Sequence, residues 1–216
     1  MIKKQVTPSI LNVPKDQRVE VINNLIDMGI QWFHYDVMDN KFVPNEAISI
    51  DEIKSFKSTC KKHLSDAHLM VNDPFKYAHE LKDYVTCLTI HYESFEKEED
   101  IVKFVNEFSH TNWVGIAIKP STDFNKIQPI LYLFDLVLIM SVEPGFGGQQ
   151  FIEKTYNKLK EIKNFINEEK LPTVIQIDGG INDLNSKELF KHGSLFNVVG
   201  SYLINNLNKE TLKKLQ

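Results

Sequence analysis

The feature that most limits the possible folds of this chain is a regular alternation between short β-rich runs and longer amphipathic stretches. Each run is rich in β-branched and aromatic residues, and a helix-like pattern follows it. The expected strands are residues 5–11, 32–37, 64–70, 87–92, 113–118, 136–140, 173–177 and 196–199. Such alternation is typical of a parallel sheet, in which each helix carries the chain back to the next strand through a right-handed crossover.

Eight strand and helix units in 216 residues leave about 27 residues for each unit, close to the ~30 of a βαβ element. Eight units of similar size favour an α/β fold of the closed (β/α)8 type, a TIM barrel. An open, doubly wound sheet built from the same elements is the structural alternative. No Ser/Gly-rich or low-complexity linker interrupts the pattern, so we expect residues 1–216 to form a single barrel domain.

Composition excludes several classes of protein. Lys and Arg number 25 against 29 Asp and Glu, with no long block of either sign, so a basic face that binds nucleic acid is not expected. The most apolar stretch, LYLFDLVLIMSV, is short and contains Asp135, which argues against a membrane span, and the N-terminus lacks the apolar core of a leader. The two cysteines, Cys60 and Cys87, suggest a reducing compartment. We therefore expect a cytoplasmic protein.

Polar residues interrupt the otherwise apolar strands towards their carboxyl ends. They are Ser9, His34, Asp36, His68, His91 and Asp178. In a barrel, the carboxyl ends of all strands form one face, and active sites of barrel enzymes are built there from several strands at once. The pattern therefore predicts that residues far apart in the sequence gather at one site.

Two imidazoles and two carboxylates in this set form a candidate metal site. Side chains at i and i+2 share one face of a strand, so His34 and Asp36 point the same way, and His68 and Asp178 would join them inside a barrel. Nitrogen and oxygen donors together suit Zn²⁺, Fe²⁺, Mn²⁺ or Co²⁺ better than Ca²⁺. Taken singly, a strand histidine is more often a hydrogen-bonded core residue, and an aspartate after a strand often caps a helix.

Three further groups of residues complete the analysis of the strand ends. Glycine-rich loops follow the sixth, seventh and eighth strands, as PGFGGQQF, DGGI and VGS, and their backbone N–H groups are suited to hold a phosphate, although each could be only a tight turn. Methionines at three strand ends are either core filler or an apolar floor beside the ligands: Met38, Met70 and Met140. His91, with Glu93 two residues later, fits either an outer part of the metal site or a structural role. The other histidines are expected in solvent: His63, His79, His110 and His192.

The segments PSIL, FHYDVMD followed by FVPN, DAHLMV, GIAIKP, SVEPGFGGQQF, IDGGI and VGS occur in the order found in the ribulose-phosphate 3-epimerase family. The chain resembles that family along its whole length. The resemblance implies a (β/α)8 barrel that interconverts D-ribulose 5-phosphate and D-xylulose 5-phosphate in the pentose phosphate pathway. It also implies a phosphosugar as the substrate. We further expect a homo-oligomer and, from charge and hydropathy, no nucleic-acid or membrane partner.

The resemblance assigns roles to individual residues. Asp36 corresponds to the base that accepts the C3 proton on one face of the sugar, and Asp178 to the acid on the other face. His34, Asp36, His68 and Asp178 would hold one divalent ion, with Zn²⁺ or Fe²⁺ favoured over Mn²⁺ or Co²⁺. The implied substrate contacts are Ser9, His68, Gly145, Phe146, Gly147, Gly148, Asp178, Gly179, Gly180, Gly200 and Ser201. Met38, Met70 and Met140 would form the pocket floor.

The chain departs from the family pattern at three places. Asn40 stands where glycine is usual, NVPKDQ replaces the commoner continuation SADF after PSIL, and Val199 replaces a common alanine. None of these changes removes an expected ligand, and asparagine tolerates a positive φ, so we expect the turn at Asn40 to be kept. Two other functions stay open: a D-allulose-6-phosphate 3-epimerase, and a phosphosugar-binding barrel without turnover. GFGG and DGGI look more like the pentulose enzyme.

Overall fold

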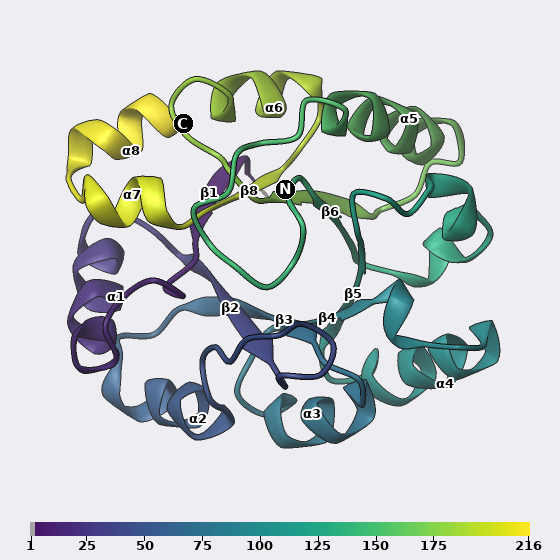
Figure 1. Cartoon of the computed structure of the whole chain (residues 1–216), viewed down its shortest axis with the longest axis horizontal. Coiled ribbons are helices and arrows are strands. Elements are labelled where there is room, and N and C mark those ends of the chain that lie inside the picture. The colour runs from purple at the N-terminus through teal and green to yellow at the C-terminus, as the bar shows by residue number, and fades with distance from the viewer. Residues whose placement is uncertain (1–2) are drawn as a thin grey trace.

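Eight parallel strands form one sheet that curls round the centre of the molecule (Figure 1). This is a computed structural model, and it describes residues 3–216. The strands are β1 (Gln5–Pro8), β2 (Trp32–Met38), β3 (Leu64–Met70), β4 (Cys87–His91), β5 (Trp113–Ile118), β6 (Leu136–Met140), β7 (Val174–Asp178) and β8 (Phe196–Val199). From β2 to β7, each strand pairs with the next one along the chain, and β8 pairs with β1. A single parallel bridge between Ser9 and His34 joins β1 to β2.

This topology confirms the prediction of a (β/α)8 TIM barrel and excludes the open doubly wound sheet. The expected strand positions agree with the observed ones to within a few residues. The largest difference is at β1, which ends at Pro8, because residues 10–13 already form a turn closed by the Val13 N–H and the Ile10 carbonyl. At the seventh strand, Asp178 is the last residue of β7 and not the first residue after it.

Helices surround the strands on the outside of the barrel (Figure 1). They are α1 (Arg18–Asp27), α2 (Ile50–Thr59), α3 (Pro74–Leu81), α4 (Glu98–Phe108), α5 (Thr155–Glu168), α6 (Ser186–His192), α7 (Ser201–Asn205) and α8 (Lys209–Leu215). Shorter 3₁₀ helices cover Lys15–Gln17, Tyr92–Ser94, Phe124–Lys126 and Gln128–Leu133. The last two replace the full helix expected after the fifth strand, where Pro129 lacks the N–H that a longer α-helix would need.

Alternation along the strands separates two layers of buried side chains. In β2, Phe33 and Tyr35 belong to the main apolar core between strands and helices, whereas Trp32 packs with residues of other strands inside the barrel. The Trp32 ring lies 5.0 Å from that of Phe196 and 5.6 Å from that of Trp113, between ring centroids. These aromatic rings fill the amino end of the barrel, so the polar residues further along the strands lie above an apolar plug.

The turn after β2 takes the shape expected for its unusual residue. Asn40 has a φ of 57°, in the left-handed region that asparagine tolerates better than most residues. Asp39 holds this turn in place, because its carboxylate accepts hydrogen bonds from the backbone N–H groups of Lys41, Phe42 and Asn72. The departure from glycine at this position therefore leaves the turn intact.

Among residues 3–216, no helix combines the length and apolar character needed to cross a membrane. Neither cysteine forms a disulfide. Cys87 is buried inside the barrel, whereas Cys60 is half-buried at the end of α2.

We expect Gly115→Ala to destabilise the barrel. Gly115 pairs with Thr89 across β4 and β5, and an added Cβ would lie 2.6 Å from the Thr89 Oγ1 atom. Overpacking of this kind costs about 1–3 kcal/mol, measurable as the free energy of unfolding in urea. The cost should be smaller when Thr89→Ala is also present, since that change removes the clashing atom. Equal costs in both backgrounds would show that the contact with Thr89 is not the cause.

Candidate active site

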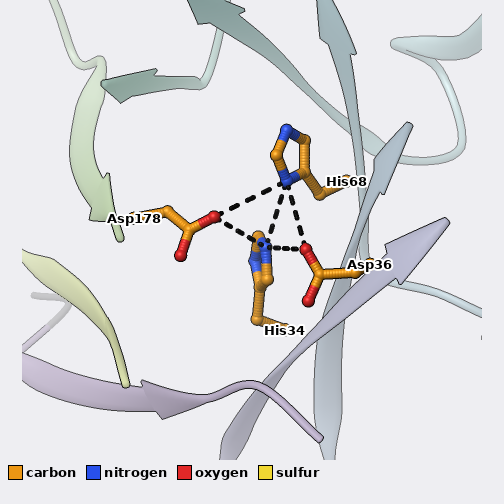
Figure 2. Close-up of side chains that lie close together, drawn as sticks. All are labelled: His34, Asp36, His68 and Asp178. Carbon is orange, nitrogen blue, oxygen red and sulfur yellow. Dashed lines mark hydrogen bonds and ion pairs between the residues drawn. The ribbon is translucent and has the colours of Figure 1, made fainter. Parts of the chain in front are cut away.

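Four side chains from three strands converge inside the barrel near its carboxyl end (Figure 2). His34 and Asp36 come from β2, His68 from β3, and Asp178 from the end of β7. One ligand atom from each residue lies within 4.8 Å of the others. Both imidazoles are fully buried, and Asp36 is 5% exposed, so the group lies largely out of water. His34 is nearer the middle of its strand than expected, which places it below Asp36.

The separations between these ligand atoms fit a small divalent ion. His34 Nε2 lies 3.3 Å from His68 Nδ1 and 3.4 Å from Asp36 Oδ1, and His68 Nδ1 lies 3.5 Å from that same oxygen. Both nitrogens lie 3.8 Å from Asp178 Oδ2. Tetrahedral bonds of about 2.0–2.1 Å require ligands roughly 3.3–3.4 Å apart, so little adjustment is needed. The two nitrogens and two oxygens could therefore hold one divalent cation.

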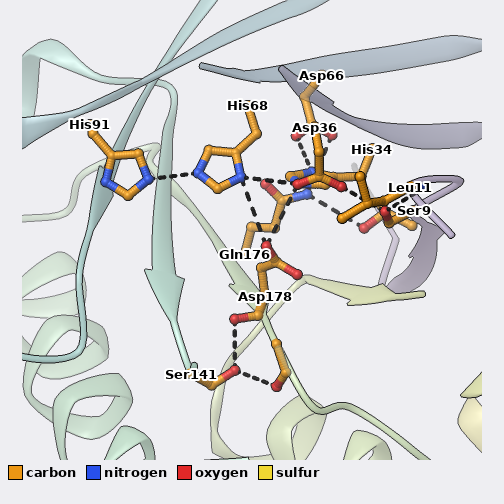
Figure 3. A network of polar contacts seen from close by, with 12 residues as sticks. Ser9, Leu11, His34, Asp36, Asp66, His68, His91, Ser141, Gln176 and Asp178 are labelled. Atoms are coloured by element: carbon orange, nitrogen blue, oxygen red, sulfur yellow. Dashed lines mark hydrogen bonds and ion pairs between the residues drawn. The ribbon is translucent and has the colours of Figure 1, made fainter. Parts of the chain in front are cut away.

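Behind His34 lies a carboxylate that the sequence analysis did not include. Asp66 Oδ2 lies 2.6 Å from His34 Nδ1 (Figure 3), and Asp66 Oδ1 accepts a hydrogen bond of 2.6 Å from the Trp32 indole. Burial alone would lower the pKa of His34, but the charges of Asp66 and Asp36 raise it well above its usual value. The negative groups round this imidazole thus favour a positive charge at the centre of the site.

A second chain of hydrogen bonds runs outward from His68. Its Nε2 lies 2.8 Å from His91 Nε2, and His91 Nδ1 lies 2.9 Å from Glu93 Oε2. Glu93 Oε1 accepts the Lys119 N–H at 2.8 Å and the Thr122 hydroxyl. Burial would raise the pKa of Glu93, but its hydrogen bonds and the nearby His91 lower it to about 2. His91 therefore contacts the candidate metal site directly, and Glu93 reaches it only through His91.

The two aspartates have opposite electrostatic environments. For Asp36, burial favours the neutral acid, but the imidazoles of His34 and His68 lower its pKa far below the usual value. For Asp178, burial raises the pKa, and the charge of Asp36 raises it further against the opposing effect of His34. The Ser9 hydroxyl also donates a hydrogen bond of 2.7 Å to Asp36 Oδ2. The site thus holds two neighbouring carboxylates of unequal proton affinity.

A cavity of about 440 Å³ opens above this group. Asp36 and Asp178 are on its wall, together with almost all the other residues predicted to contact a substrate or form a floor. These are Ser9, Met38, Met70, Met140, Gly145, Phe146, Gly147, Gly148, Gly179, Gly180, Gly200 and Ser201. His68 is the exception, because it lies beneath the cavity with no exposed surface.

Side chains from two other loops reach the glycine-rich wall and were not predicted. Asn12 donates a hydrogen bond of 2.6 Å to the Ser201 hydroxyl. The side-chain nitrogen of Asn12 also lies close to Gly147, where an added Cβ would be only 2.5 Å from it. Asn45 donates to the Gly145 carbonyl at 2.7 Å. Asn12 lies in the NVPKDQ segment and Asn45 in FVPN, so both segments stood out in the sequence, but no pattern indicated the contacts of these two side chains.

The expectation that His63 is solvated is wrong. The imidazole is half-buried, and its Nε2 lies 2.6 Å from the Tyr35 hydroxyl, while its Nδ1 contacts the Lys61 carbonyl at 2.6 Å. His63 therefore supports a buried tyrosine outside the barrel. His79, His110 and His192 are exposed as expected.

Comparison with known proteins places the chain among a well-defined group. Residues 5–204 match the model of the ribulose-phosphate 3 epimerase family. A ribulose-phosphate 3-epimerase of Schizosaccharomyces pombe is 34% identical over 186 residues, covering 84% of this chain and 78% of that protein. One from Synechocystis sp. is 32% identical over 204 residues, covering 94% of this chain and 88% of that protein.

Solved structures with the same fold include enzymes of other names. A 3-hexulose-6-phosphate synthase superimposes with a TM-score of 0.69 at 14% identity, covering 99% of this chain and 97% of that one. A phosphoribosyl anthranilate isomerase from Thermus thermophilus gives 0.64 at 10% identity, covering 98% and 96%. At such identities the likeness shows the shared barrel alone.

We expect the metal-stripped protein to bind one Zn²⁺ per chain in a calorimetric titration. His68→Ala should weaken binding by more than the ~10-fold to 100-fold typical of a change beyond the ligands, because it removes a neutral nitrogen donor. His110→Ala, at an exposed position, is the matched control and should bind as the unchanged protein does. Unaltered Zn²⁺ affinity in His68→Ala would exclude this ligand set.

Proposed function

Because this chain belongs to the ribulose-phosphate 3-epimerase family, we propose that it interconverts D-ribulose 5-phosphate and D-xylulose 5-phosphate. The observation that carries the proposal is the placement of Asp36 and Asp178 on one cavity, from strands far apart in the sequence, round the same pair of imidazoles (Figure 2). This arrangement offers two proton-transfer groups to one bound sugar.

Epimerisation at C3 needs such a pair. A proton next to a carbonyl is only weakly acidic, and its removal leaves a planar enediolate that must receive a proton on the opposite face. One carboxylate takes the proton from one epimer and the other completes the inversion, with the roles exchanged in the reverse direction. The Ser9 hydroxyl donates a hydrogen bond of 2.7 Å to one oxygen of Asp36. This contact suits Asp36 to a fixed position beside C3.

His34, Asp36, His68 and Asp178 would hold a divalent cation, which supplies stabilisation for the negative charge that develops on the sugar oxygens as C3 loses its proton. The neutral imidazoles and the carboxylates both suit Zn²⁺ or Fe²⁺, and Mn²⁺ or Co²⁺ as alternatives. His68 acts here as a buried ligand and not as a direct contact of the sugar, because it does not reach the cavity wall.

The glycine-rich wall is suited to the phosphate group. Gly145, Gly148, Gly179 and Gly180 line the cavity and all have positive φ, a conformation that glycine adopts without steric cost, and they place no side chain over their own backbone. At Gly180 a Cβ would lie 2.5 Å from the Phe151 nitrogen, so the loops pack too closely for any other residue. The three methionines provide an apolar wall for the planar intermediate.

Parallel assays with D-ribulose 5-phosphate and D-allulose 6-phosphate test the substrate. We expect the higher kcat/KM for the pentulose, because GFGG and DGGI, which line the cavity, look more like the loops of the pentulose enzyme. A higher kcat/KM for the hexulose would change the proposed substrate but leave the proposed proton-transfer chemistry standing. No turnover of either sugar by metal-replete protein would favour a binding function instead.

We expect Asp36→Asn and Asp178→Asn each to slow interconversion by at least ~10²-fold, because each removes one acid/base group while keeping the size of the side chain. Solvent deuterium exchange at C3 then separates the two roles. Asp178→Asn should still exchange the proton of the epimer that Asp36 faces, and Asp36→Asn should prefer the other epimer. Metal content is measured in both variants, since loss of the ion would have the same effect on turnover. Equal exchange of one epimer by both metal-replete variants would contradict two separate bases.

A further inference from the structure

The chain of contacts behind His68 differs from the one behind His34. His34 meets a carboxylate directly, with its Nδ1 2.6 Å from Asp66 Oδ2. His68 instead meets a second imidazole, His91 (Figure 3), and the carboxylate of Glu93 comes only after it. His91 is fully buried, and both of its ring nitrogens are engaged. A histidine that only filled space would need neither contact.

The contacts of Glu93 determine which atoms carry protons. Its Oε1 faces the Lys119 backbone N–H, which can only donate, and its ionised carboxylate has no proton of its own. His91 must therefore donate from Nδ1 to Glu93 Oε2, which leaves His91 Nε2 as an acceptor. His68 must in turn donate from Nε2 to His91, and its Nδ1 keeps a lone pair that points to Asp36, His34 and Asp178.

We propose that Glu93 and His91 are positioning residues that hold His68 in the tautomer whose Nδ1 is free to bind a cation. The proposal deepens the function proposed above and rests on it, because the cation at this site is the one used in epimerisation. An imidazole with its proton on Nδ1 would present N–H to the ion and could not bind it. Glu93 and His91 together form a relay, which determines from outside the cavity which nitrogen of His68 can bind the cation.

The surroundings of His91 hold the relay in one geometry. Its ring lies edge to edge with that of His68 and close to its plane, with centroids 4.9 Å apart and an angle of 28° between planes. On another side lies Phe42, with centroids 4.9 Å apart, and the Lys119 ammonium lies over the Phe42 ring. Because His91 is enclosed by these groups, it cannot rotate to offer a different nitrogen to His68 without displacing them.

Glu93→Gln is the sharpest test, because it keeps the size of the side chain but should reverse the direction of the hydrogen bonds that lead to His68. The Lys119 N–H requires an acceptor at the Oε1 position, so the amide oxygen takes that place and the NH₂ group faces His91 Nδ1. His91 must then carry its proton on Nε2, and His68 is driven to carry its own on Nδ1, towards the metal site. A purely structural role for Glu93 would leave this isosteric variant unchanged.

The tautomer of His68 can be measured without any metal or substrate. A two-bond ¹H–¹⁵N correlation spectrum of the metal-free full chain should show the His68 proton on Nε2, and in Glu93→Gln on Nδ1. The result on the unchanged protein needs no variant, so the proposal stays testable if Glu93→Gln fails to fold. A His68 proton on Nδ1 in the unchanged protein would overturn it.

Metal affinity supplies the second measurement. Competition with a chromogenic chelator should show Zn²⁺ and Co²⁺ bound about 10-fold to 100-fold more weakly by Glu93→Gln, the range typical of residues that orient a ligand. Glu107→Gln is the matched control, because it makes the same change at an exposed histidine–glutamate pair in which His79 Nε2 lies 3.0 Å from Glu107. Equal affinities in Glu93→Gln and Glu107→Gln would also overturn the proposal.

These readouts separate the relay from the proposed function. If the tautomer and metal affinity respond as expected but the unchanged protein does not epimerise either sugar, the relay stands and the assigned reaction falls. If the protein epimerises but Glu93→Gln keeps both the His68 tautomer and the Zn²⁺ affinity, the reaction stands and the relay falls.

Discussion

The constraint on which the rest of this site depends is negative charge held inside a closed barrel. Asp36 and Asp66 are buried, Asp178 lies beside them, and all three act on the imidazole of His34. Unpaired, a buried carboxylate costs several kcal/mol, so such a group persists only where donors or cations balance it. The serine, indole and imidazole contacts supply part of this balance. A divalent cation, which adds two positive charges at the point where the carboxylates meet, would supply the rest and lower the mutual repulsion.

The barrel brings these charged side chains close together and also fixes their positions. Alternate residues of β2 point inward, so the Trp32 ring, the His34 imidazole and the Asp36 carboxylate follow one another from the amino end to the cavity. The aromatic plug of Trp32 and Phe196 supports the polar layer from below. Ligands on strands that are packed on both faces have little freedom to move, which is the condition for a site that binds and orients before reaction.

Much of this arrangement was predictable from local pattern. The alternation of strands and helices predicts the barrel, and the rule that i and i+2 share a face predicts that His34 and Asp36 point together. The same rule applied to LSDAHLM would have placed Asp66 beside His68, because both lie on one face of β3. What the rule could not supply is register: Asp66 contacts His34 because the two residues are paired across β2 and β3, and Asp36 is paired with His68. That pairing depends on packing round the whole barrel. The missing helix after β5 has a local cause, because Pro129 lacks the N–H that a longer α-helix would need, and 3₁₀ turns bury the apolar residues instead.

The contacts of the loops follow neither from the alternation of strands and helices nor from the pairing of the strands. The fold is shared by enzymes with different names at identities of 10% to 14%, so the barrel itself does not select a reaction. In this chain, side-chain hydrogen bonds join loops that follow different strands. Asn45 from the β2 loop bonds the Gly145 carbonyl, and Asn12 from the β1 loop bonds Ser201. Each joins a segment that follows an early strand to a glycine loop that follows a late one. These bonds hold the loops round the cavity together, while the charged groups of the candidate site lie on the strands beneath.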